Sequence, residues 1–259
     1  MDLLKVHRRR SRLSDVAYIS LNVGLAFALF AIVHFSQAPW LAGLVMLLSK
    51  WRIFAVRPRF WFVNLIANMV DITVGLSVVV LLSAAETSLL LQGVITALYI
   101  VWLLFIKPRS KREFVAVQAG VAVFVGITAL SIISYTWDSA LFVLAMWGIG
   151  YVAARHVLGS YEEPHTVLYS VIVACIFAEL GWIGFHWMMA YPVLGLGEVQ
   201  LSQLALFGIL FCFVAERAYA SYHRFGSVRR TDILPPIILT IAVMITTYVF
   251  AVLFGSSAL

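Results

Sequence analysis

Two carboxyl groups lie near the middle of long apolar segments, Asp71 in residues 60–82 and Glu179 in residues 166–191. At a helical rise of 1.5 Å per residue, they lie about 16 Å and about 20 Å from the start of their segments. Both would sit deep in a hydrocarbon core roughly 30 Å thick, with no lysine or arginine expected at that depth. If the two helices touch, at least one acid should be protonated or hold a cation. The pair therefore predicts a proton- or cation-coupled transport site.

Polar residues accompany both acids. Asn64 and Asn68 share the helical stripe of Asp71 and lead toward it from the start of the segment, and His186 shares the face of Glu179. Gly75, on the Asp71 stripe, would let another backbone or a substrate approach closely. The alternative is an interhelical clamp of protonated acids. Membrane hydrogen bonds contribute only about 0.6 kcal/mol on average, a small return for inserting an acid, so the pattern favours function.

A basic and aromatic stretch around Pro58 is a candidate site for an anion or a lipid head group. Its cations are Lys50, Arg52, Arg57 and Arg59. Guanidinium and ammonium groups bind phosphate well, and Pro58 stiffens the chain between the last two. The simpler alternative is that these residues are only topology signals beside a span.

The rest of the sequence contains no motif that indicates a metal site, a cofactor or an enzyme. His156, Glu162, Glu163 and His165 have the composition of metal ligands without their spacing, so we predict no metal site. Gly-rich phosphate loops, nucleophile elbows and paired cysteines are absent, so we predict no cofactor. The two cysteines, Cys175 and Cys212, fall inside apolar segments and are expected to be buried thiols.

The composition requires a membrane to position these groups. Of 259 residues, 63% are hydrophobic and 12% are charged, against roughly 45–50% and about 25% in soluble proteins. We expect an all-α polytopic bundle forming a single membrane-embedded domain over residues 1–259, with a basic tail at 1–16 that is retained rather than cleaved. The expected spans are 17–34, 39–56, 60–82, 88–106, 114–134, 140–158, 166–191, 201–217 and 233–254.

The charges predict the orientation of these nine spans. All 18 Lys and Arg residues fall in alternate connections or at their span ends, whereas the other connections hold only the acids Glu86, Asp138 and Glu198. The positive-inside bias therefore places the N-terminus in the cytoplasm and the C-terminus outside a plasma (inner) membrane. The net charge of +6 is then a match for anionic lipids at the cytoplasmic face, and we predict no nucleic-acid partner.

Two features of this arrangement are less regular. The span at 39–56 has Lys50 and Arg52 in its last two turns, which we expect to snorkel toward the head groups. Spans three and seven each follow a proline and contain a mid-span acid, and spans four and eight each contain a glutamine, Gln92 and Gln203. This similarity predicts a possible 4+4 parallel repeat plus one added helix.

Three functions remain open from the sequence. The leading hypothesis is a small proton- or cation-coupled transporter using the mid-membrane carboxyls. The first alternative is a structural or assembly subunit that joins other membrane subunits. The second is an intramembrane enzyme acting on a lipid-linked substrate, with Asp71 or Glu179 as acid or base and Arg57 and Arg59 holding a phosphate. An enzyme is the less expected class, because the acids lie deep and the cations lie at the surface.

Overall fold

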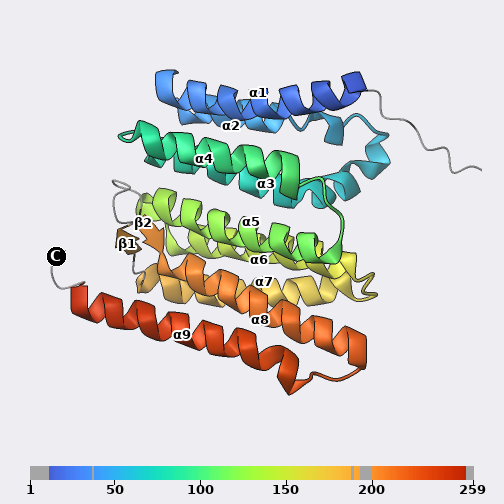
Figure 1. Ribbon diagram of the computed structural model, residues 1–259, viewed down its shortest axis with the longest axis vertical. Helices are drawn as coiled ribbons and strands as arrows, with labels where there is room; N and C mark the ends of the chain where they lie inside the picture. The colour runs from blue at the N-terminus through green and yellow to red at the C-terminus, as the bar shows by residue number, and fades with distance from the viewer. Residues whose placement is uncertain (1–11, 37, 188–189, 193–199, 255–259) are drawn as a thin grey trace, which may run out of the picture.

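The protein is a bundle of helices that lie side by side across the long axis of the molecule, with consecutive helices running antiparallel (Figure 1). The computed structural model describes residues 12–36, 38–187, 190–192 and 200–254. Eight of its helical segments are long and apolar enough to cross a membrane. The expected fold class, a polytopic helical membrane bundle, is confirmed. The α-helices are α1 Arg12–Ser36, α2 Pro39–Leu48, α3 Trp61–Ala84, α4 Leu89–Val101, α5 Arg112–Ile133, α6 Ser139–Ser160, α7 Thr166–His186, α8 Gln203–Phe225 and α9 Arg230–Phe254.

The second expected span is the exception. Helix α2 has ten residues, about 15 Å or half the hydrocarbon core, and ends at Leu48. The chain then passes through two short 3₁₀ turns, η1 (Trp51–Ile53) and η2 (Pro58–Phe60), before α3 begins. The prediction of one helix over 39–56 is wrong. Ending α2 at Leu48 lets Lys50 turn into the protein, whereas a continuous helix would have placed it along the span.

Smaller differences lie at the ends of the later helices. Helix α7 ends at His186, and α8 continues to Phe225, eight residues past its expected end, where Gly226 adopts a left-handed φ of 69° and terminates it. Helix α9 begins at Arg230 rather than at 233. It includes Pro235 and Pro236 as its sixth and seventh residues, and because proline has no N–H, the carbonyls of Thr231 and Asp232 lack their usual helical donors. Two three-residue strands, β1 (Ala190–Pro192) and β2 (Gln200–Ser202), pair antiparallel between α7 and α8.

The helices form two units that share one order of packing. In the first unit, α1–α4, helix α1 packs on α2 and α4, and α2 packs on α3. In the second unit, α5–α8, helix α5 packs on α6 and α8, and α6 packs on α7. Helix α3 joins the units by packing on α5 and α6, and α9 packs on α8. This is the arrangement that a 4+4 repeat with one added helix predicts, although a duplication in the sequence remains a prediction.

The described residues form two apolar cores, one mainly within α1–α4 and one within α5–α8, and in each a glycine lies against a methionine. A Cβ atom at Gly75 in α3 would lie 1.9 Å from Cε of Met46 in α2. A Cβ atom at Gly181 in α7 would lie 2.8 Å from Cβ and Cγ of Met146 in α6. Both methionines are fully buried. The expectation that another backbone or a substrate approaches Gly75 is not met in the structure, where the side chain of Met46 fills that space.

The exposed cations gather at one end of the bundle, which we call the basic end. It contains the turns η1 and η2, the α4–α5, α6–α7 and α8–α9 connections, and the start of α1 (Figure 1). Glu86 and Asp138 lie in the connections at the opposite end. The basic residues before Arg12, and Glu198, fall outside the described residues. The cytoplasmic placement of the basic end, and the plasma membrane itself, remain predictions.

Candidate functional site

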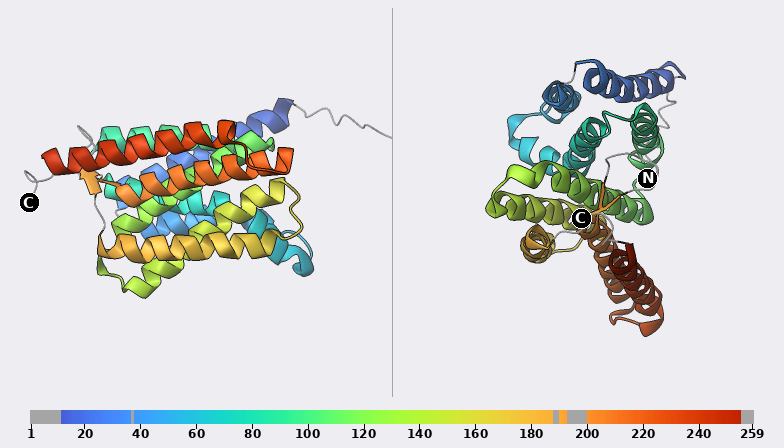
Figure 2. Two further views of the ribbon diagram at one scale, coloured as in Figure 1. Left: turned by 90° about the horizontal axis from the view of Figure 1, so that it is seen from below. Right: turned by 90° about the vertical axis from the view of Figure 1, so that its left-hand side faces the viewer.

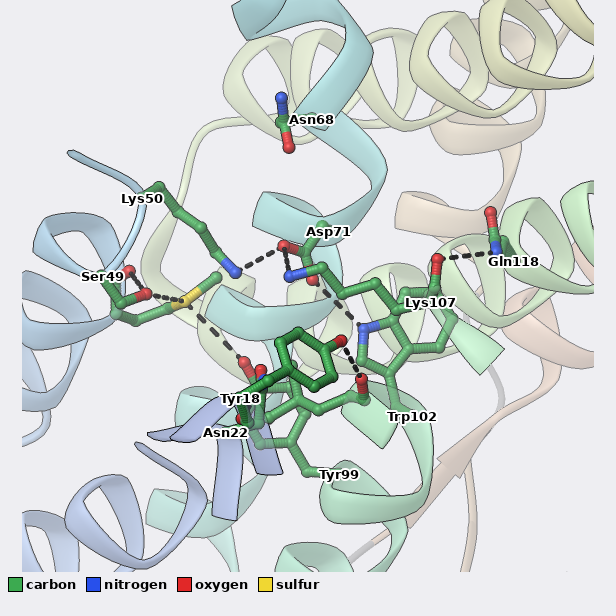
Figure 3. A network of polar contacts seen from close by, with 12 residues as sticks. Tyr18, Asn22, Ser49, Lys50, Asn68, Asp71, Tyr99, Trp102, Lys107 and Gln118 are labelled. Carbon is green, nitrogen blue, oxygen red and sulfur yellow. Dashed lines mark hydrogen bonds and ion pairs between the residues drawn. The ribbon is translucent and has the colours of Figure 1, made fainter. Parts of the chain in front are cut away.

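The carboxylate of Asp71 lies at the centre of a buried ionic cluster (Figure 3). Its Oδ2 atom is paired with Nζ of Lys50 and lies 2.8 Å from Nζ of Lys107. Its Oδ1 atom accepts a hydrogen bond of 3.3 Å from the indole N–H of Trp102. The expectation that no cation lies at this depth is wrong for Asp71. Both lysines reach it from helix ends at the basic end of the bundle, so we call Lys50, Asp71 and Lys107 the ion triad.

The early end of α2 positions Lys50. This residue is only 9% exposed and lies two residues past the last residue of the helix. The Ser49 hydroxyl donates to the carbonyl of Met46 at 2.6 Å, and the Lys50 carbonyl accepts from the N–H of Ile53 at 2.9 Å. These bonds reverse the chain around Lys50. Its ammonium group therefore faces α3, and the expected snorkelling away from the core does not occur.

A π-helical turn at the end of α4 positions the other two groups. In η3 (Trp102–Ile106) the N–H of Lys107 donates to the carbonyl of Trp102, five residues earlier, at 2.9 Å. A π turn widens the helix, shifts the side chains around its axis and is frequent at functional sites. Here Trp102 and Lys107, which bracket this turn, both contact Asp71.

Residues from α1 and the second unit stabilise this π turn. The Tyr18 hydroxyl of α1 donates to the carbonyl of Leu103 at 3.2 Å. The Gln118 amide of α5 donates to the carbonyls of Ile106 at 2.8 Å and Arg109 at 2.9 Å. His156 of α6 lies 2.8 Å from Oε1 of Gln118, so its Nε2 is the protonated nitrogen in this arrangement. Both units therefore determine where Lys107 lies.

The ion triad has a net charge of +1 when all three groups are ionised. Excess charge inside a protein is costly unless it is paired or bound to a counter-ion. The two cations are not equivalent, because the side chain of Lys107 is 31% exposed and that of Lys50 is 10% exposed. Lys107 is therefore the member through which the cluster can meet ions or protons from the basic end.

The asparagines that were expected to lead to Asp71 have another role. The Asn68 amide donates to the backbone carbonyl of Asn64 at 2.8 Å and lies apart from the triad (Figure 3). Asn64 reaches the carbonyl of Ile53 at 3.5 Å, and the Trp61 indole donates to the carbonyl of Val56 at 2.9 Å. These residues connect α3 to the irregular chain between α2 and α3.

Glu179 is not part of the site. It is exposed on the outer face of α7, while α6 packs on both α3 and α7 and separates Glu179 from Asp71. The expectation that the two acids meet is therefore wrong. His186 is also exposed, with Nδ1 2.9 Å from the Trp182 carbonyl. Cys175, expected to be buried, is exposed on α7.

The four cations expected to form an anion site are separated in the structure. Arg52, Arg57 and Arg59 are exposed in or beside the turns η1 and η2, and the Arg59 guanidinium lies 4.6 Å from the centre of the Phe60 ring. Lys50 instead turns inward to Asp71. Among the described residues, no hydrogen bond or ion pair joins these three arginines to the Asp71 carboxylate.

The second unit has its own polar cluster at the basic end. The Tyr161 hydroxyl at the end of α6 donates to Glu216 at 3.3 Å, and the Tyr219 hydroxyl donates to Glu163. The Arg112 guanidinium lies 4.9 Å from the centre of the Tyr161 ring. Burial raises the pKa of the Tyr161 phenol, and the nearby Glu216 carboxylate raises it further. These contacts fasten the α6–α7 connection to α8.

Comparison with known proteins adds no family to this description. The chain matches no family model, and no curated protein or solved structure is significantly similar to it.

Proposed function

We propose that this multi-pass membrane protein is a small proton-coupled carrier whose coupling site is the ion triad. The observation that supports the proposal is the convergence of Lys50 and Lys107, from two irregular helix ends, on the buried Asp71. Broken helices whose ends meet a charged group near the middle of the membrane are a recurring feature of secondary transporters. Asp71 lies ten residues into α3, about 15 Å along it.

The charges of the triad suggest how a proton and an anion would be coupled. With Asp71 ionised, the carboxylate neutralises one lysine and leaves one positive charge for an anion. Protonation of Asp71 would remove both ion pairs, so it would free the end of α2 and the end of η3 to move. Lys107, the more exposed member, would meet the anion first. The leading hypothesis from the sequence is thus retained, with Asp71 and two lysines in place of two acids.

Proton flux into liposomes tests this proposal. The full chain would be reconstituted in liposomes that contain a pH-sensitive dye, and inward gradients of chloride, acetate or inorganic phosphate would be applied. We expect the wild type to change the internal pH faster than empty liposomes for at least one anion. We expect Asp71→Asn to reduce the rate to that of empty liposomes.

The matched control is Glu86→Gln, because Glu86 is an exposed acid in the connection between α3 and α4. It should keep the wild-type rate. A folded Asp71→Asn protein that also keeps the wild-type rate would show that the triad does not couple a proton to transport.

A second candidate function, a subunit of a membrane assembly, is favoured by the position of Glu179. A carboxyl group on the outer face near the middle of an apolar helix costs free energy in lipid, and a partner helix could satisfy it. Cys175 lies one helical turn away and is also exposed, so it can report such a contact. Oxidative cross-linking in native membranes should capture a copy or another subunit through Cys175. Glu179→Leu should weaken that product, and its persistence would argue against this role of the carboxyl.

A further inference from the structure

A groove opens between the last turns of α8 and the first turns of α9, at the basic end of the bundle. Its volume is ≈ 490 Å³. Helices α8 and α9 extend away from the first unit, which contains the ion triad (Figure 2). The residues on which the inference depends are Phe213, Arg217, Ser221, Arg224, Asp232 and Pro236.

The polar part of the groove has two guanidinium groups and one carboxylate. Arg217 and Arg224 are seven residues apart on α8 and so share one face of the helix. The Asp232 carboxylate accepts a hydrogen bond of 2.7 Å from the Ser221 hydroxyl, whose oxygen accepts one of 3.0 Å from the N–H of Arg229.

The two arginines keep most of their hydrogen-bonding capacity. Among the described residues, the ion pair of Arg217 is a 3.7 Å contact with the neighbouring Glu216, and 56% of its side chain is exposed. Arg224 lies 5.5 Å from the centre of the Phe225 ring and forms no ion pair within the part of the chain that the structure describes. Two guanidinium groups on one helix face form a suitable pair of donors for a phosphate.

The remaining walls of the groove are apolar. They are formed by Phe213 of α8 and by Pro235, Pro236 and Leu239 of α9. Proline has no backbone N–H, so this side of the groove offers ring carbons rather than hydrogen-bond donors. Beyond it, α9 continues as an exposed apolar helix, with Ile238 56% exposed and Leu239 49% exposed. A ligand that fits the groove therefore has an anionic end and an apolar end.

We infer that the groove between α8 and α9 binds one anionic phospholipid. Arg217 and Arg224 hold the phosphate, and an acyl chain lies along the apolar wall that begins at Pro235 and Pro236. A zwitterionic head group has its own cation beside the phosphate, which the two arginines repel. A soluble phosphate ester would leave the apolar wall exposed. The chemistry of both ends thus favours a lipid with a net negative head group.

Native mass spectrometry of the purified full chain tests this inference. The protein in a mild detergent would be titrated with phosphatidylglycerol and, separately, with phosphatidylcholine of the same acyl chains. We expect one saturable phosphatidylglycerol site. The double variant Arg217→Gln/Arg224→Gln loses both charge-assisted contacts to the phosphate, so we expect it to bind at least about tenfold more weakly.

The matched control is Arg57→Gln/Arg59→Gln, which removes two exposed arginines at the same end of the bundle. It should keep the affinity, and so should Asp71→Asn, because lipid binding does not depend on the ion triad. Equal losses in the two arginine double variants would mean nonspecific attraction to the basic end and would overturn the inference. Equal binding of phosphatidylcholine would also overturn it. Competition by glycerol phosphate at the same concentration as the lipid would assign the groove to a soluble phosphate ester instead.

Discussion

Asp71 and Glu179 occupy corresponding helices of the two four-helix units, α3 and α7, yet their surroundings differ. Asp71 is 6% exposed and contacts two cations and an indole N–H, whereas Glu179 faces outward. The difference arises in the neighbouring helices. In the first unit α2 stops at Leu48 and α4 ends in a π turn, and these irregular ends supply Lys50, Trp102 and Lys107.

Within its described residues, the second unit has neither a shortened helix nor a π turn. Helix α6 is continuous from Ser139 to Ser160, and α8 is continuous to Phe225 and makes little contact with α7. Its polar contacts lie instead at the basic end, where Tyr161 and Tyr219 donate to glutamates. The environment of a mid-membrane acid is therefore determined by interruptions in neighbouring helices rather than by its position in its own helix.

Replacing the mid-membrane acid of each unit should give the largest difference in the free energy of unfolding. Asp71→Leu leaves two unpaired cations in the interior, and breaking a buried ion pair typically costs about 3–5 kcal/mol. Glu179→Leu should not destabilise the protein, because it replaces an exposed carboxyl on an apolar helix face, where that group costs free energy. Denaturant unfolding in detergent micelles, followed by circular dichroism, would measure both. Similar losses in the two variants would contradict the difference in environment described above.

Single lysine substitutions would sharpen the same comparison. Lys107→Met leaves the neutral Lys50–Asp71 pair, so we expect it to cost clearly less than Asp71→Leu, by about 2 kcal/mol or more. The same unfolding measurement applies. A loss equal to that of Asp71→Leu would mean that the triad does not have an excess positive charge.

The glycine and methionine contacts test the packing of each unit. A Cβ at Gly181 would meet the stem of Met146, which has little freedom to move, so Gly181→Ala should destabilise by about 1–3 kcal/mol. At Gly75 the clash is mainly with the flexible end of Met46, and the loss should be smaller. Thermal unfolding of both variants would rank them. Gly93→Ala, in open space, is the control and should be neutral or stabilising by up to about 1 kcal/mol.

The connection between the units is tested at Gln118. Gln118→Leu removes the donors to the carbonyls of Ile106 and Arg109, which should cost about 1–3 kcal/mol. Because these bonds position η3, the liposome flux should also fall. Gln203→Leu on α8 is the matched control and should keep the flux. Lost stability with wild-type flux would mean that η3 does not need this link to place Lys107.

The smallest effect is expected at Tyr161. Its pKa is raised in the folded protein, so it contributes stability that is complete below the unfolded value near 10 and is lost as the pH rises through the folded pKa. Tyr161→Phe should remove that part of the alkaline loss, together with a hydrogen bond contributing about 1 kcal/mol. Stability measured between pH 8 and pH 11 would show it. Parallel curves for wild type and variant would contradict the raised pKa.

Much of the fold could be predicted from the sequence, and the failures are local. Long apolar segments predict helices, because a chain in lipid must satisfy its backbone hydrogen bonds internally. The prediction of one helix over 39–56 is wrong because the ion pair between Lys50 and Asp71, formed across the bundle, is more favourable than continuing the helix. Asp71 was identified as a site residue from its depth. Lys107, Trp102 and Gln118 were missed because their contacts depend on a π turn that no local pattern indicated.

The sequence by itself determined that this protein is a membrane-embedded helical bundle with an acid deep in α3, because hydropathy and helix length are local properties. Only the tertiary structure decided which acid acquires partners. Helices α3 and α7 are equally apolar in pattern, and nothing in either segment shows that cations from two helix ends meet Asp71 while α7 turns Glu179 outward. Those outcomes depend on contacts between residues far apart in the chain. Such contacts arise when whole helices pack, and they decide where a buried charge can be neutralised.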